Sequence, residues 1–240
     1  MDESNLVNGK PVYYWVDVKD ATVPSDAGFV ALVNCTNITV QHVELYNNGH
    51  GILLALTTDS MVALNSFTGN RVGVGIYQSS RNTVSENYIF NNGVGIEVGD
   101  SVENEIVGNS IKENNGWGIR FTGSQRDNII YRNNFIYNKV TDGLQVSIDK
   151  RYGPGLGNRW DNGSEGNYWS DYATRYPNAT QIEGTQIGNT VFYINENNQD
   201  NCPMLTQTVI PEFSSTALVV ILLTLVSIGS VTYKRKLTKN

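Results

Sequence analysis

The stretch ENYIFNNGVGIEVG, Glu86–Gly99, decides the fold of this chain. Its glycines, Gly93 and Gly95, stand one residue apart beside an apolar segment, a spacing shared by nucleotide-binding loops and by bends in repetitive folds. A dinucleotide-binding loop occurs once and opens a long helix, and no long helical segment follows here. The spacing also recurs in nearby parts of the chain, at Gly73/Gly75 and Gly116/Gly118. We therefore interpret these glycines as bends of a repeat.

A repeat with a period near 22 residues runs through the chain. Its pattern is V/I-x-x-N-x-I/F, then a polar turn, then G-I-x-V. The first apolar position falls, at spacings of 22, 22, 22 and 24, on Val40, Val62, Val84, Ile106 and Ile130. The asparagine falls on Asn65, Asn87, Asn109 and Asn133. The pair that opens the second strand falls, at less even spacings of 24, 20, 23 and 25, on Gly51-Ile52, Gly75-Ile76, Gly95-Ile96, Gly118-Ile119 and Gly143-Leu144.

Two short alternating strands per repeat predict an all-β parallel β-helix. A coil of this length cannot bury its own apolar residues, so it stacks on neighbours about 4.8 Å away through parallel hydrogen bonds. The segments PVYYWVDV and GFVALV match strands of an earlier coil, which gives about six coils of about 22 residues. We expect the four asparagines to form an internal ladder at a bend, each side-chain amide bonding to the next coil.

Composition and charge narrow the class of protein. The 30 asparagines and 23 glycines tolerate left-handed backbone and favour frequent turns, as an all-β repeat requires. The net charge is −6, but residues 1–233 carry 13 − 23 = −10, a surface that does not attract nucleic acid. Two cysteines, Cys35 and Cys202, are too few for a disulfide framework, and Cys35 ends an apolar run typical of a small buried residue.

The C-terminal segment predicts membrane attachment. Residues 214–233, SSTALVVILLTLVSIGSVTY, carry no charge and at about 1.5 Å per residue would span roughly 30 Å, the thickness of a bilayer core. The basic run at 234–236 should stay cytoplasmic, which places the preceding chain outside the cell. The alternative, a buried helix of a soluble domain, lacks an amphipathic pattern. Four N-glycosylation sequons fit an external location, at Asn34, Asn37, Asn162 and Asn178.

The motif Pro211-Glu212-Phe213, together with the apolar span and the basic tail, resembles the archaeal PEF-CTERM sorting signal. The resemblance implies cleavage near this motif by an archaeosortase and attachment at the cell surface; otherwise the span is an ordinary membrane anchor. We divide the chain into β-helix repeats (1–150), a cap (151–209), and a sorting motif, transmembrane helix and basic cytoplasmic tail (210–240). The N-terminal MDESNLVNGK does not resemble a signal sequence, so we expect further coils upstream.

Beyond residue 151 the period is lost and aromatic residues gather in GNRWDNGSEGNYWSDY. A solenoid must cover its last coil, and aromatic side chains do this well, so one interpretation is the core of a cap. The other is a platform on which sugars stack. The candidates for sugar contact are Tyr77 in the repeats and Trp160, Tyr168, Trp169 and Tyr172 in the cap.

The repeats NTVSENYIFNNGVGI and NEIVGNSIKENNGWGI, followed by GNYWSDY and INENNQDNCPML, resemble the NosD-type β-helix family. These repeats are also called periplasmic copper-binding or CASH (carbohydrate-binding and sugar-hydrolysis) repeats. The resemblance covers residues 10–236 and extends to archaeal surface members that end in an IPEF tail. It implies a right-handed, single-stranded parallel β-helix.

The family's copper label implies His, Met or Cys ligands within reach of one another. The candidates are His42, His50 and Met61, although a turn histidine is more often simply solvated. Family members also often carry an acidic loop that could hold calcium. The corresponding segment, NATQIEGTQIGN, has Glu183 as its only carboxylate, whereas calcium needs several oxygen ligands. We predict no bound cofactor, with copper and calcium as alternatives.

The outward position of the G-I-x-V strand defines a column that we align as Leu53, Tyr77, Glu97, Arg120 and Gln145. Glu97 and Arg120 are its charged neighbours and the candidate catalytic pair. A glycosidase needs two carboxylates facing a cleft, so the alternative interpretation is a cross-strand surface pair.

Three functions fit these observations. The first is a non-catalytic protein, anchored at the cell surface, that presents a rigid face to surface glycans. The second is a polysaccharide-processing hydrolase or lyase of the CASH kind, by analogy of fold. The third is copper binding or delivery, as the NosD resemblance implies.

Overall fold

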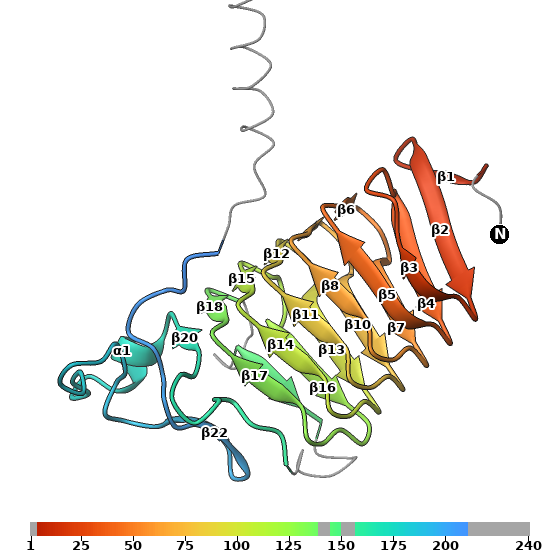
Figure 1. The fold of residues 1–240 in the computed structure, drawn as a ribbon. Coiled ribbons are helices and arrows are strands. Elements are labelled where there is room, and N and C mark those ends of the chain that lie inside the picture. Colours follow the sequence, from red (N-terminus) through yellow and green to blue (C-terminus); the bar gives the residue numbers. More distant parts are fainter. Residues whose placement is uncertain (1–3, 139–144, 150–156, 211–240) are drawn as a thin grey trace, which may run out of the picture.

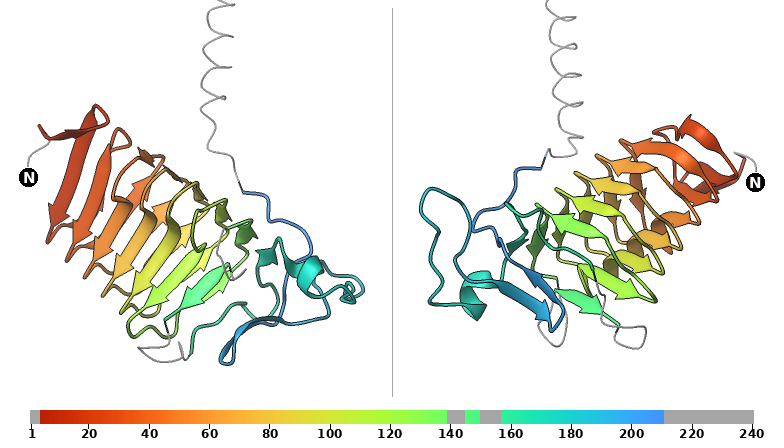
Figure 2. Two further views of the ribbon diagram at one scale, coloured as in Figure 1. Left: turned by 180° about the vertical axis from the view of Figure 1, so that it is seen from behind. Right: turned by 60° about the horizontal axis from the view of Figure 1, so that its bottom comes forward.

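The structure, a computed structural model, describes residues 4–138, 145–149 and 157–210. Parallel β-coils stack along one axis, and a small cap covers the C-terminal end of the stack (Figure 1). The strands of successive coils form three sheets around a common core (Figure 2). The prediction of an all-β parallel β-helix is confirmed.

Each sheet takes one strand from each complete coil. The first sheet contains, in order, β1 (Leu6–Val7), β2 (Lys10–Val16), β4 (Phe29–Val33), β7 (His50–Ala55), β10 (Val72–Tyr77), β13 (Val94–Gly99), β16 (Ile119–Thr122) and β19 (Val146–Ile148). The second contains β3 (Lys19–Thr22), β5 (Thr36–Gln41), β8 (Met61–Ala63), β11 (Thr83–Ser85), β14 (Glu105–Val107) and β17 (Ile129–Tyr131). The third contains β6 (Glu44–Tyr46), β9 (Ser66–Thr68), β12 (Tyr88–Phe90), β15 (Ser110–Lys112), β18 (Asn134–Ile136) and β20 (Tyr168–Trp169).

The coils have three strands rather than the two that the repeat predicts. The pattern V/I-x-x-N-x-I/F is not one strand, because its asparagine stands at a bend between the second and third sheets, as Asn87 does between β11 and β12. Five coils are complete, from β4 to β18, rather than about six. The coil of β2 and β3 has no strand in the third sheet. Among the described residues, the last coil has β19 in the first sheet and β20 in the third sheet but no strand in the second.

Two apolar columns form the core as predicted. In the second sheet Val62 pairs with Val40 and Val84, and Ile106 pairs with Ile130. The third sheet stacks, in register and fully buried, Leu45, Phe67, Ile89, Ile111 and Phe135. Both cysteines are free thiols, and Cys35 is buried in this core.

The glycines of the first sheet are more regular than the sequence alignment suggested. Val74 pairs with Ile52 and Ile96, so the residue that stacks with Gly51 and Gly95 is Gly73 and not Gly75. A Cβ atom on Gly73 would lie 2.6 Å from the carbonyl oxygen of Gly95 and 2.8 Å from Ile89 Cγ2, so no larger residue fits. The corrected column has spacings of 22, 22 and 23 at Gly51, Gly73, Gly95 and Gly118. Gly143 lies outside the described residues.

The predicted asparagine ladder is present. Asn87 is fully buried, and its backbone N–H and its side-chain Nδ2 both donate to Asn109 Oδ1, at 3.0 and 2.9 Å. Asn87 Nδ2 also donates to the carbonyl of Val62, at 2.8 Å. Asn65, Asn109 and Asn133 repeat these contacts. The ladder satisfies the backbone at the bend, where strand pairing is interrupted.

Two further asparagine ladders stand at the other two bends and were missed. One runs between the third and first sheets, through Asn70, Asn92, Asn114 and Asn138. The other runs between the first and second sheets, through Asn82, Asn104, Asn128 and Asn158. The first of them has the same spacings of 22, 22 and 24 as the predicted ladder, so its signal was in the sequence.

The cap buries the aromatic residues that follow the repeats. Trp169 stacks between Phe135 and Phe192, with ring centroids 4.3 and 4.1 Å apart, and Trp160 packs edge-on against Phe121 at 5.8 Å. Both tryptophans have 1% exposure or less, so neither can stack on a sugar. That interpretation is wrong for them, and they form the core of the cap.

Tyr172 begins the short helix α1 (Tyr172–Arg175) and is also buried, with its hydroxyl donating to the carbonyl of Thr190 at 2.7 Å. It too is unavailable to a sugar. The cap is completed by the hairpin β21 (Phe192–Asn195) and β22 (Asn198–Asp200). Tyr168 remains half-buried and adds the last strand to the third sheet.

Within the described residues, no helix is long and apolar enough to cross a membrane. The predicted span at 214–233 and the motif Pro211-Glu212-Phe213 lie outside those residues.

Candidate functional site

Four side chains lie together on the outer face of the first sheet. The sequence predicted three different roles for them: metal binding, sugar contact and catalysis. His50 begins β7, Tyr77 ends β10, Glu97 lies in β13 and Arg120 lies in β16. His50 and Arg120 are 70 residues apart in the sequence, but the parallel pairing places these strands side by side. We call these four residues the first-face cluster.

The strand register confirms one pair of the predicted column and corrects the rest. Glu97 pairs directly with Arg120 on one side and with Gly75 on the other. Tyr77 lies two residues further along β10, where it pairs with Gly99. The error follows from aligning Gly75 rather than Gly73 with the other repeats.

Gln145 does not belong to the outer face. It precedes β19, is buried, and its Nε2 donates to Asp171 Oδ1 at 2.6 Å. Its Oε1 accepts from Asn138 Nδ2 at 3.1 Å, so it ends an asparagine ladder.

Glu97 and Arg120 form an ion pair, in which Arg120 Nη2 donates to Glu97 Oε2. Glu97 is only 7% exposed although it points away from the core. A carboxylate so far removed from water needs a partner, so loss of Arg120 would leave an uncompensated buried charge. The Arg120 guanidinium lies 5.7 Å from the ring of Trp117, and its Nε is buried without a hydrogen-bond partner among the described residues.

His50 and Tyr77 form the second half of the cluster. His50 Nε2 lies 3.2 Å from the Tyr77 hydroxyl, and the rings meet edge to face with centroids 5.9 Å apart. Both rings lie over Gly75, where a Cβ atom would be 2.8 Å from His50 Cδ2 and 2.8 Å from Tyr77 Cε2. Gly99 makes room for the other edge of the Tyr77 ring, 2.9 Å from its Cδ1. The two glycines form a floor that lets the rings lie close to the sheet.

The electrostatic environment keeps both rings neutral at pH 7. Burial lowers the pKa of His50, the charge of Arg71 lowers it further, and Glu97 opposes the shift. Burial raises the pKa of Tyr77 to about 12, and the charge of Glu97 adds to this effect. The face therefore presents two neutral hydrogen-bonding groups between Glu97 and two arginines, Arg71 and Arg120.

Sequence reasoning missed Trp117 as a member of this face, and it also missed the charge of Arg71 that acts on His50. His50 pairs with Val72, and Val72 pairs with Val94. The carbonyl of Trp117 accepts from the N–H of Gly95 at 3.0 Å, which places Trp117 next in the same column. The corrected glycine column identifies this position, because Trp117 directly precedes Gly118.

The proposed metal ligands are not brought together. His42 is exposed at the bend after β5, Met61 begins β8 in the second sheet, and His50 lies in the first sheet. Within the described residues, no three His, Cys, Asp or Glu side chains are grouped so as to hold a metal ion, and Glu183 is exposed. The residues present therefore do not fit a copper centre or a calcium loop in this part of the chain.

The four predicted sequons are all exposed: Asn34, Asn37, Asn162 and Asn178. The first two stand at bends with φ of 52° and 55°. Asn34 Nδ2 donates to Asp17 Oδ1, and Asn37 Nδ2 donates to Asp20 Oδ1 at 2.7 Å.

Comparison with protein families gives a match to the fold described above. The model of the family described as periplasmic copper-binding protein (NosD) matches residues 16–174, which contain the five complete coils and the first part of the cap. No curated protein and no solved structure matches the chain. The matched region covers more than half of the chain and has the parallel β-helix that the resemblance implied. The chain belongs to the NosD family.

Proposed function

We propose that this protein is a non-catalytic β-helix protein, held at the outer cell surface, that binds carbohydrate through the first-face cluster together with Trp117. The observation that carries the proposal is the convergence of His50, Tyr77, Glu97 and Arg120 on consecutive strands over a glycine floor. Parallel β-strands hold these groups in fixed positions before any ligand arrives. A ligand then binds without the entropy cost of ordering them.

The chemistry of the face suits a sugar. Aromatic rings offer apolar faces for the C–H surface of a pyranose, and Tyr77 and Trp117 supply them. Arg120 and His50 offer a guanidinium and an imidazole for hydroxyl groups, and the buried Glu97 carboxylate holds Arg120 in place. A compact set of polar groups beside aromatic rings is the usual composition of a small-molecule site.

Binding is favoured over catalysis by the state of Glu97. A retaining or inverting glycosidase uses two carboxylates across the scissile bond. The first-face cluster holds one carboxylate, and that carboxylate is engaged by Arg120. A fixed ion pair orients a ligand well but is a poor source or acceptor of a proton.

Surface attachment rests on the sequence beyond residue 210. The uncharged stretch 214–233 followed by a basic tail supports a membrane anchor, or a signal like PEF-CTERM processed by an archaeosortase. Four exposed sequons support an extracellular location.

A glycan array probed with the full chain tests the binding proposal. We expect a defined set of glycans to bind the wild-type protein. Tyr77→Ala and Trp117→Ala should each weaken binding about tenfold, which corresponds to about 1.4 kcal/mol. Tyr131→Ala, which removes a tyrosine from the second sheet, is the matched control and should bind as the wild type does. Equal binding by all four proteins, or by none, would exclude the first face as the site.

A further inference from the structure

The last described residues return along the outer face of the third sheet. We call Met204–Ile210 the C-terminal strap. Asn134 in β18 holds it by two hydrogen bonds: Asn134 Nδ2 donates to the carbonyl of Thr208, and the N–H of Thr208 donates to Asn134 Oδ1, both at 2.8 Å. The Met204 N–H donates to the carbonyl of Asn167, at 2.8 Å. The strap is thus fixed at both its start and its middle.

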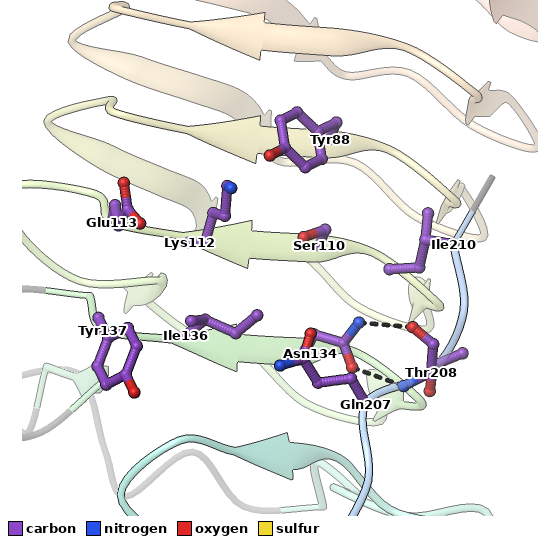
Figure 3. A pocket seen from close by; sticks show the side chains of 10 residues that line it. All are labelled: Tyr88, Ser110, Lys112, Glu113, Asn134, Ile136, Tyr137, Gln207, Thr208 and Ile210. Atoms are coloured by element: carbon purple, nitrogen blue, oxygen red, sulfur yellow. Dashed lines mark hydrogen bonds between the residues drawn. The ribbon is translucent and has the colours of Figure 1, made fainter. Parts of the chain in front are cut away.

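A groove of about 370 Å³ lies between the strap and the third sheet (Figure 3). Its lining includes Tyr88, Ser110, Lys112, Ile136, Tyr137 and Ile210. Ile210 therefore lies beside β12 and β15, which belong to earlier coils than β18. The described chain ends over the middle of the third sheet and not at the capped end of the stack.

The length of chain that follows limits how far this face can be from a membrane. Ser214, where the uncharged stretch begins, is four residues beyond Ile210. A fully extended chain covers at most about 3.6 Å per residue, or about 14 Å over these four. If residues 214–233 enter the bilayer, the face around Ile210 must lie within about that distance of the membrane surface. Processing at Pro211–Phe213 would leave the tether shorter still.

The side chains on this face suit a lipid headgroup layer. Its half-buried outer positions include Tyr46, Tyr88, Phe90 and Tyr168, alongside Glu44 and short polar residues such as Ser66 and Thr68. Lys112 Nζ lies 5.0 Å from the ring of Tyr88. Tyrosine concentrates at membrane interfaces, and lysine lays its apolar stem there while its charge reaches the water.

Two large side chains on this side of the molecule are open to solvent: Val209 in the strap, and Tyr137 at the far end of the groove (Figure 3). Tyr137 is 67% exposed and Val209 is 93% exposed. The outer positions of the second sheet are more mixed, with Thr39, Thr83 and Ser85 beside Met61, Val107 and Tyr131. Of these two faces, the third sheet is the one over which the described chain ends.

We propose that the outer face of the third sheet rests on the lipid headgroups, so that the β-helix lies along the membrane with its first sheet turned elsewhere. The proposal rests on the membrane attachment stated under Proposed function. The proposed orientation is not imposed by a membrane anchor alone. A β-helix attached by the same segment but standing perpendicular to the membrane would keep this face in water.

Quenching by labelled lipid tests the orientation. The full chain carrying Cys202→Ser is reconstituted into phosphatidylcholine vesicles that contain a lipid with a nitroxide on its headgroup. One variant adds Thr68→Cys on the outer face of β9, and its matched partner adds Thr122→Cys on the outer face of β16; both threonines are half-buried. Each is labelled with the same fluorophore. We expect quenching at position 68 to exceed quenching at position 122 several-fold.

Flotation of the same samples separates the two proposals. Protein that floats with the vesicles but is quenched equally at both positions, or more at 122, would overturn the orientation while leaving the attachment intact. Protein that does not float would overturn the attachment and the orientation together. A further variant, Tyr88→Ser with Phe90→Ser, should reduce the difference between the two positions, whereas Tyr77→Ser should leave it unchanged.

Discussion

At the scale of single residues, asparagine is the residue that makes the bends of this solenoid possible. A bend interrupts strand pairing and leaves backbone groups in the interior, where an unpaired N–H or C=O is costly. An asparagine there offers one acceptor to the coil before it and donors to carbonyls of its neighbours, as Asn109 does for Asn87 and Val84. The ladder uses both the oxygen and the nitrogen of each asparagine amide. Aspartate would lose the donors at this position, and leucine would lose the donors and the acceptor.

Asn109→Ala should lower the free energy of unfolding by about 3 kcal/mol. The substitution leaves the Asn87 N–H and the Val84 carbonyl buried without these partners, and each such group costs about 1–3 kcal/mol. Asn87 Nδ2 loses one of its two acceptors and keeps the carbonyl of Val62. Urea unfolding monitored by circular dichroism measures the change. Ser85→Ala, on the outer face of β11, is the control and should shift the free energy by less than about 0.5 kcal/mol. A loss at Asn109 no larger than at Ser85 would show that the ladder does not stabilise the bend.

The sequence predicted this ladder because Asn65, Asn87, Asn109 and Asn133 keep one distance from an apolar residue whose period is visible. It did not predict the bend-to-bend geometry, because a strand of three residues is too short to show an alternation of its own. The pattern V-x-x-N-x-I is compatible with one strand or with two strands on either side of a bend. Only the pairing between strands of successive coils distinguishes these two assignments.

At the scale of elements, the cap continues the repeat chemistry with different residues. Asn133 is followed in its ladder by Asn167, whose backbone N–H donates to Asp200 Oδ2 at 2.7 Å. Asp200 thus ends the column and also accepts from Trp169 Nε1 at 2.9 Å. The carboxylate has no exposure to solvent. One acid therefore joins the solenoid to the aromatic core of its cap.

Burial raises the pKa of Asp200 to about 7, against the opposing effect of the N–H groups that donate to it. Between its ordinary pKa of 3.8 and about 7, the folded protein holds this proton while the unfolded chain releases it. Stability should therefore fall as the pH rises through this window, by at most about 1.4 kcal/mol per pH unit. Unfolding free energies measured across the window should show a weaker slope in Asp200→Asn, which keeps an oxygen for Asn167 and Trp169. Equal slopes in the two proteins would refute the assignment.

The first sheet shows why the sequence did not predict the places of Trp117 and Gly75 in the site. In RVGVGIY both Gly73 and Gly75 could align with the Gly-Ile pairs of other repeats, and similarity to those pairs favours Gly75. The packing of Gly73 against Gly95 and Ile89 shows that Gly73, and not Gly75, aligns with the glycines of the other repeats. Once that register is known, Trp117 falls in the column of His50, and Gly75 is free to form the floor beneath the rings. Glu97 and Arg120 could be paired from the sequence because both follow well-aligned glycines.

At the scale of the whole molecule, the three sheets give the rod three chemically different faces. The first carries charged and aromatic side chains on a glycine floor, and the second mixes short polar residues with apolar ones such as Met61 and Val107. The third carries several tyrosines, of which Tyr88 lines the groove at the C-terminal strap. A solenoid separates such faces because each outer column depends on one position of the repeat. A face that holds the rod at a membrane can therefore coexist with one that binds a glycan.

The most direct test of the carbohydrate-binding face uses the two histidines of the chain as reporters, because His50 lies in the first sheet and His42 lies at the bend after β5. Proton NMR of the full chain follows both imidazole signals while the best glycan from the array is added. We predict a saturable shift of the His50 signals, an unchanged His42, and a His50 pKa below its ordinary 6.5 in the free protein. Saturable binding that moves His42 alone, or neither histidine, would contradict this prediction.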